Sequence, residues 1–91
     1  MKDQLGLYYY PAPENHRIRM YVRERFATVE FRMWNADYPE VWERHGWIPF
    51  EDIQAAAALY KEKGRGSDPM LLYDLNVAKR LVADEAAGTA H

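Results

Sequence analysis

The chain has 91 residues, of which 48% are hydrophobic and 29% are charged, and it contains no cysteine. This length corresponds to about one domain, and the composition argues against disorder. The lack of cysteine excludes disulfides, thiolate metal sites and thiol nucleophiles, and it favours a reduced, cytoplasmic location. Because no apolar run approaches the roughly 18 residues of a membrane span and no signal peptide opens the chain, we expect no membrane partner.

Charge is distributed unevenly along the chain, although the net charge is only −2. Basic residues are concentrated between Arg17 and Arg32, whereas residues 35–91 carry an acidic excess. Nucleic-acid-binding proteins usually combine a basic patch with a raised overall isoelectric point. Only the patch is present here, which weakens a nucleic-acid interpretation without removing it.

The first predicted element is a strand over residues 5–10, in which apolar and other side chains alternate. A loop that contains Pro11 and Pro13 follows it, because proline cannot donate a backbone hydrogen bond to a sheet. We expect this strand to run antiparallel to the next one, with its apolar side chains in the core. The predicted pairs are Leu5–Val22, Leu7–Met20 and Tyr9–Ile18.

Two further strands are predicted over residues 16–23 and 28–34, because apolar residues alternate with polar ones in both. A four-residue loop over residues 24–27 is expected to join them, since neither Arg25 nor Phe26 suits the positive φ of a two-residue turn. One antiparallel register places the apolar residues of both strands on a single face. The predicted pairs are Val22–Val29, Met20–Phe31 and Ile18–Met33.

Helical spacing dominates the rest of the chain. The first predicted helix covers residues 38–45, with Asp37 and Glu40 spaced as in a capping box and Gly46 at its C-terminal end. The second covers residues 49–63 and opens with Pro49 in its first turn. Aromatic and apolar side chains in this region are expected in the core, namely Trp42, Trp47, Phe50, Ile53, Ala57 and Tyr60.

The third predicted helix covers residues 69–85, with Asp68 as its N-cap and a frayed tail after it over residues 86–91. Its inner face is expected to hold Leu71, Leu75, Ala78 and Val82. The predicted fold is therefore α+β: a three-stranded antiparallel meander followed by three helices packed on one face, forming one domain over residues 1–85.

Few residues have the arrangement that catalysis or metal binding requires. The loop that begins at Gly64 lacks the spacing of a phosphate-binding loop, and Asp68 takes the place of an anion at the following helix start. His45 has no second metal ligand on its helical face. It is expected instead to interact with the last carbonyl groups and the dipole of its helix. Ser67 is the only serine, and no histidine lies near it in sequence. We expect no enzymatic activity, no metal and no cofactor.

The strongest functional candidate is the face of the predicted sheet that points away from the helices. It gathers arginines and aromatic rings, and the predicted register opposes Arg19 and Arg32, which is unfavourable unless an anion or a ring separates them. We call this surface, together with Glu30, the Arg/Tyr face. Its candidate binding residues are Tyr8, Tyr10, Arg17, Arg19, Tyr21, Arg23, Arg32 and Trp34.

Three interpretations of the Arg/Tyr face follow from its chemistry. In the first, the arginines lie over the aromatic rings and Glu30 and have a purely structural role. In the second, the face, or the edge strand over residues 5–10, docks a protein partner or a second copy of the chain. In the third, single-stranded nucleic acid stacks on the rings. We favour a small non-catalytic protein-interaction or accessory module that forms a homodimer or binds another protein. Single-stranded nucleic-acid binding is the alternative.

Overall fold

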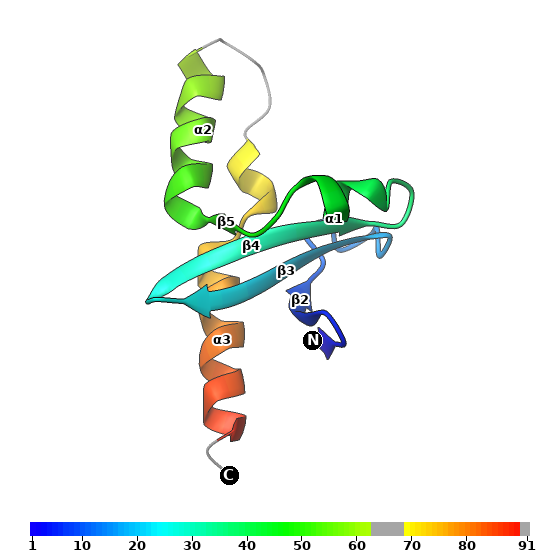
Figure 1. Cartoon of the computed structure of the whole chain (residues 1–91), viewed down its shortest axis with the longest axis vertical. Coiled ribbons are helices and arrows are strands. Elements are labelled where there is room, and N and C mark those ends of the chain that lie inside the picture. The colour runs from blue at the N-terminus through cyan, green and yellow to red at the C-terminus, as the bar shows by residue number, and fades with distance from the viewer. Residues whose placement is uncertain (63–68, 90–91) are drawn as a thin grey trace.

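The computed structural model describes residues 1–62 and 69–89 (Figure 1). Its class is α+β, as predicted, with one antiparallel sheet of five strands in sequence order rather than three. The two shortest strands carried no alternation that the sequence could reveal. The strands are β1 (Lys2–Asp3), β2 (Gly6–Tyr9), β3 (Ile18–Arg25), β4 (Thr28–Asn35) and β5 (Ile48–Pro49).

The helices differ from the prediction mainly at their ends. They are α1 (Glu40–Arg44), α2 (Phe50–Glu62), the 3₁₀ helix η1 (Pro69–Leu72) and α3 (Leu75–Thr89). The predicted third helix is therefore split, and the carboxylate of Asp74 caps α3 by accepting the Val77 N–H at 3.1 Å. Helix α3 continues past Ala86, where a frayed tail was expected, as far as Thr89. The expected cap Asp68, Gly64 and Ser67 lie outside the described residues.

Helix α1 is not capped as predicted. Pro39 stands at its N-cap position without a side-chain cap, and Asp37 accepts hydrogen bonds from Arg17 instead. Pro49 lies in β5, directly before α2, rather than in the first helical turn. These differences shorten both helices without moving them along the sequence.

The β3–β4 register is shifted by two residues from the predicted one. Met20 pairs with Met33 and Val22 with Phe31. A shift of two preserves which side chains share a face, so the apolar set still points the same way. The shift places Arg23 opposite Glu30 and removes the predicted opposition of Arg19 and Arg32. Cross-strand charge pairing favours this register.

The shift also shortens the connecting loop to two residues, so the predicted four-residue loop is wrong. Arg25 and Thr28 pair, and the loop consists of Phe26 and Ala27 with φ values of 52° and 61°. Both values are left-handed, as a two-residue hairpin of this type requires. Neither residue type adopts this conformation readily, because a Cβ atom crowds the following carbonyl there.

Strand β2 is shifted in the same sense. It pairs Leu7 with Val22 and Tyr9 with Met20, so the predicted pairs of residues 5–10 are also displaced by two positions. Gly6 has a φ of 133°, which glycine adopts without strain, and it opens β2 directly after the turn from β1. Leu5 consequently lies in a turn and is 46% exposed rather than in the core.

The main hydrophobic core lies between one face of the sheet and the helices α2 and α3. Met20, Val22 and Phe31 are essentially fully buried on the sheet side, facing Ile53 of α2 and Ala78 of α3. Helix α3 crosses behind β2, β3 and β4, while α2 extends beyond the β5 edge (Figure 1). The predicted burial of Ile53, Ala57 and Ala78 is confirmed. The side chains of Tyr60 and Leu71 lie outside the described part.

The prediction that all three helices pack on one face is wrong for α1. This helix lies along β4 and brings Trp42 onto the Arg/Tyr face, where its ring meets Tyr21 edge-on at 5.2 Å. Trp47 lies 6.1 Å from Trp42 on the same side. The two tryptophans therefore form a second apolar layer on the opposite face, outside the main core in which they were expected.

Candidate interaction surface

Arg19 lies between two aromatic rings at the centre of the Arg/Tyr face. Its guanidinium carbon is 4.9 Å from the ring centroids of both Tyr8 and Trp34. Its Nη1 donates to Asp3 Oδ2 at 3.0 Å and to the hydroxyl of Tyr21 at 3.4 Å. Its Nε is buried without a hydrogen-bond partner among the described residues. The guanidinium is thus held mainly by groups of its own chain.

Asp3 and Tyr21 form the polar centre beside Arg19. The Tyr21 hydroxyl donates to Asp3 Oδ2, and the Tyr21 side chain is fully buried, whereas we expected it to face water. Burial and the bond to Asp3 raise the pKa of Tyr21 to about 12. Burial alone would raise the pKa of Asp3, but hydrogen bonds from Tyr21 and from the Leu5 N–H outweigh it and lower that pKa. This cluster fastens β1 to the sheet.

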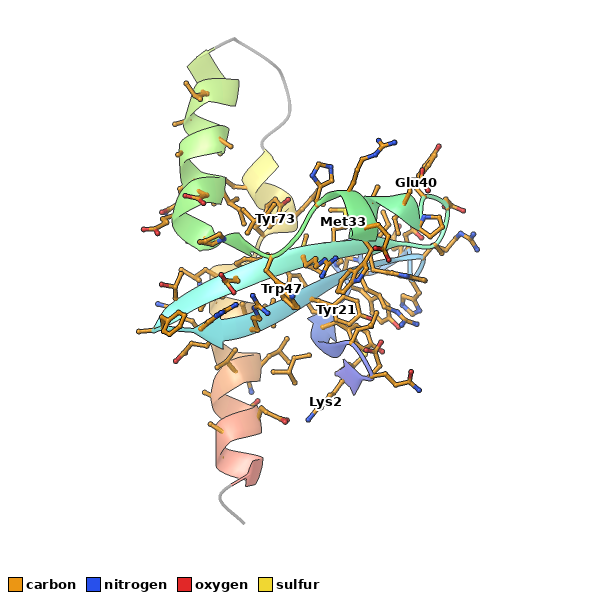
Figure 2. All side chains as sticks on the ribbon, viewed as in Figure 1. Lys2, Tyr21, Met33, Glu40, Trp47 and Tyr73 are labelled. Atoms are coloured by element: carbon orange, nitrogen blue, oxygen red, sulfur yellow. The ribbon has the colours of Figure 1, made fainter. Side chains whose placement is uncertain are left out.

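The other two central arginines are also engaged by the protein. Arg23 Nε donates to Glu30 Oε1 at 2.6 Å, and its guanidinium lies 4.4 Å from the Trp47 ring centroid. Arg32 lies 3.8 Å from the ring centroid of Trp42 and donates to the carbonyl oxygens of Trp42 and His45. We expected the His45 side chain to interact with the last carbonyl groups of α1, but Arg32 donates hydrogen bonds to carbonyls at this end of the helix. Figure 2 shows Tyr21 and Trp47 on this side of the sheet.

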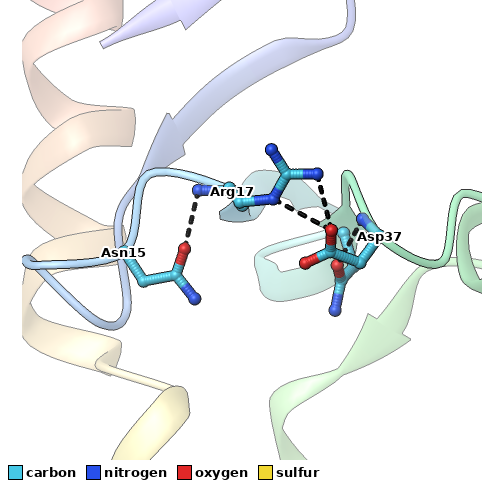
Figure 3. A network of polar contacts seen from close by, with 4 residues as sticks. Asn15, Arg17 and Asp37 are labelled. Atoms are coloured by element: carbon cyan, nitrogen blue, oxygen red, sulfur yellow. Dashed lines mark hydrogen bonds and ion pairs between the residues drawn. The ribbon is translucent and has the colours of Figure 1, made fainter.

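Arg17 and Tyr10 lie at the margin of the face. Arg17 is exposed and donates through Nε to Asp37 Oδ1 at 2.9 Å (Figure 3). Its N–H binds the side chain of Asn15, and the N–H of Asp37 binds that of Asn35, so two matching turns hold the ion pair. The pKa of Arg17 is raised and that of Asp37 lowered, chiefly by their mutual hydrogen bond. Tyr10 stacks on His16 at 4.1 Å and meets the Tyr8 ring edge-on at 5.7 Å.

The structure therefore gathers the predicted residues on one face but gives most of them partners within the chain. Tyr8, Arg19, Tyr21, Arg23, Arg32 and Trp34 form one network with Trp42 and Trp47, which the sequence did not place there. Tyr10 joins that network through Tyr8, and Arg17 stands beside it. This arrangement matches the interpretation in which the arginines lie over the aromatic rings and have a structural role.

The tip of the β3–β4 hairpin differs from that network. Phe26 is 89% exposed, more than any other large hydrophobic side chain among the described residues. Among the described residues, only the guanidinium of Arg25 lies over its ring, at 5.2 Å from the centroid. The tip projects past the helices (Figure 1). We call Glu24, Arg25, Phe26 and Ala27 the tip surface; sequence reasoning missed it because the loop was expected to be longer.

The edge of β3 that leads to the tip is open. The β2–β3 ladder ends at Leu7 and Val22, whereas the β3–β4 ladder continues to Arg25. In a two-residue hairpin the pair flanking the loop, here Arg25 and Thr28, exchanges both hydrogen bonds. The N–H and C=O of the preceding residue, Glu24, therefore point away from β4, toward the side on which β2 lies further along β3. No described strand pairs with Glu24 on that side. Glu24 therefore offers a free N–H and C=O for strand addition.

A pocket of about 550 Å³ lies at the N-terminal end of β2, beyond its last pair with β3. We call it the edge pocket. Its rim carries charges of both signs, from Lys2, Arg23, Glu24 and Glu85. Its remaining walls are mostly apolar and come from Leu5, Leu7, Val22, Trp47, Val82 and Ala86, with Gly6 between them.

A smaller pocket of about 300 Å³ lies beside His45, between β4, α1 and Tyr73. Its described lining contributes no carboxylate to His45. Among the described residues, no three histidine, aspartate or glutamate side chains come together as a metal site would need. Likewise, none of the described helices has the length and apolar character needed to cross a bilayer. In the described part of the chain, the tip surface and the edge pocket are the two features on which a functional argument can rest.

Comparison with known proteins assigns no relative. No protein-family model matches the chain, and neither a curated protein nor a solved structure shows significant similarity to it.

Proposed function

We propose that this chain is a non-catalytic protein-interaction module that binds its partner through the tip surface and the open edge of β3. The observation that carries the proposal is the state of Phe26, which is 89% exposed on left-handed backbone. An aromatic side chain gains most by leaving water, and left-handed backbone costs a non-glycine residue about 1–2 kcal/mol. An isolated protein gains nothing from either feature.

A partner protein gives both features a purpose. Aromatic side chains and arginine are enriched where proteins contact one another, and the tip surface presents Phe26 next to Arg25. The backbone of Glu24 offers hydrogen bonds to an added strand at the same place. The favoured contact surface is therefore the end of the hairpin rather than the Arg/Tyr face.

The contacts of the Arg/Tyr face weigh against the nucleic-acid alternative. A single-stranded nucleic acid needs exposed rings for stacking and cations for its phosphates. Here Tyr21 is fully buried and Arg19 is occupied by Asp3 and two rings. Arg23 is paired with Glu30, and Arg32 with the carbonyls of α1. Binding would require these contacts to be broken first.

Photo-crosslinking in the native host tests the proposal. Phe26 is replaced by a benzophenone-bearing phenylalanine analogue, and the control carries the same analogue at Leu59 of α2, which is also exposed at 60%. We expect an ultraviolet-dependent protein adduct from position 26 that position 59 does not give. Equal or absent adducts from the two positions would overturn the proposal. The mass of the adduct identifies the partner.

A further inference from the structure

We infer that the partner is a second copy of this chain: Phe26 of each copy enters the edge pocket of the other. The inference rests on the proposed function, because it uses the same tip surface. It adds the identity of the partner and the site that receives the ring.

The edge pocket has room for an aromatic ring and walls of the right character. Its volume of about 550 Å³ lies within the range of roughly 300–1,000 Å³ that is typical of small-molecule sites, which is more than one phenyl ring fills. Leu7, Val22 and Val82 supply apolar walls. Phe26 of the same chain does not fill this space, since its ring is almost wholly exposed. One molecule therefore carries both an unburied ring and an unfilled apolar pocket.

Charge complements this match. Arg25 lies over the Phe26 ring and is carried with it into any contact. The receiving pocket has Glu24 on its rim, and this side chain is exposed. A docked tip therefore brings a guanidinium toward a carboxylate at each of the two contacts, which favours encounter and orientation.

The geometry of β3 allows both contacts to form at once. The tip surface and the edge pocket meet at Glu24, which belongs to both. A two-fold axis beside this part of β3 places each tip at the pocket of the other copy, so the contact is reciprocal and closes as a dimer. The backbone groups of Glu24 on the open edge then face the partner's hairpin, where strand addition supplies hydrogen bonds.

Sedimentation velocity over a concentration series tests the dimer, with two variants that leave the fold intact. Phe26→Asn removes the ring and places a residue that tolerates left-handed backbone. Ala86→Arg puts a long charged side chain into the pocket from an exposed helical position, and Ala87→Arg is its matched control outside the lining. We expect the wild type and Ala87→Arg to dimerise, and each of the other variants to lose roughly tenfold or more in affinity.

Mixing the two defective variants tests the pairing of tip with pocket. Phe26→Asn retains an intact pocket and Ala86→Arg retains an intact tip. A mixed dimer therefore keeps one of the two contacts, and we expect the mixture to associate more tightly than either variant alone. A wild type that stays monomeric at millimolar concentration would overturn the inference, as would variants that dimerise like the wild type or a mixture that gains nothing.

The two proposals fail in distinguishable ways. If position 26 crosslinks to a different protein and the wild type is a monomer, the protein-interaction module stands and the second copy is wrong. If position 26 gives no adduct beyond that of position 59, both proposals are wrong.

Discussion

The centre of the Arg/Tyr face and the tip surface both belong to the β3–β4 hairpin, yet their side chains have opposite surroundings. On the Arg/Tyr face, Arg19, Arg23 and Arg32 each contact a ring and a carboxylate or carbonyl oxygen of the same chain. At the tip, the Phe26 side chain is exposed to solvent and its backbone is left-handed.

This contrast shows which kind of structural feature indicates a binding partner. Arginines beside aromatic rings resemble a binding surface in composition, but here their polar and π contacts are largely made within the chain. The tip has an unremarkable composition, but among the described residues its exposed ring is contacted only by Arg25, and nothing there offsets its unfavourable backbone. An uncompensated cost is the stronger indication of a partner.

Breaking the network at Asp3 is expected to have the largest effect. Asp3→Ala leaves the buried Tyr21 hydroxyl without its acceptor, and we expect it to lower the free energy of unfolding by about 1–3 kcal/mol. Urea unfolding measures this. In a Tyr21→Phe background the same substitution should cost less, because the stranded hydroxyl is gone; an equal cost in both backgrounds would contradict the coupling.

Relaxing the tip is expected to act in the opposite direction. Phe26→Asn combined with Ala27→Gly supplies residues that suit a two-residue hairpin, and we expect it to raise the free energy of unfolding by about 1–2 kcal/mol. Urea unfolding in dilute solution, where self-association is minimal, measures the gain. A destabilised variant would show that Phe26 serves the fold and would remove the contrast between the two regions.

Acid is expected to weaken the network with the smallest amplitude. The pKa of Asp3 lies below its ordinary value of 3.8 in the folded state, so below that pH the unfolded chain binds more protons than the folded one. The stabilisation is complete above pH 3.8 and declines as the pH falls toward the folded pKa. Urea unfolding across this range should show a shallower decline for Asp3→Asn, whereas Phe26→Asn should retain the wild-type decline.

The sequence identified which side chains share a face, because alternation survives any register shift of two residues. The α+β class, the two long strands and the burial of Ile53 and Ala78 followed from periodicity. The register itself needed the charge of individual side chains: Arg23 opposite Glu30 is favourable, whereas Arg19 opposite Arg32 is not. That comparison used residues already visible in the sequence.

Other features depend on contacts between distant segments, which local patterns do not encode. Strand β1 has two residues and is held by Asp3, which reaches Arg19 and Tyr21 across the sheet. Trp42 and Trp47 were correctly expected to pack on apolar neighbours, but the layer in which they pack is set by the path of α1. The tip surface was missed because the strained loop contradicts local turn preferences.

The hydroxyl of Tyr9 links parts of the chain that are synthesised far apart in time. It donates to the carbonyl of Leu72 at 2.7 Å and accepts the N–H of Asp74 at 2.8 Å, so a β2 phenol fixes the junction of η1 and α3. The ribosome makes the sheet first, and α3, which shields its apolar side, emerges later. Nascent chains are consequently expected to need chaperone protection until that helix has docked.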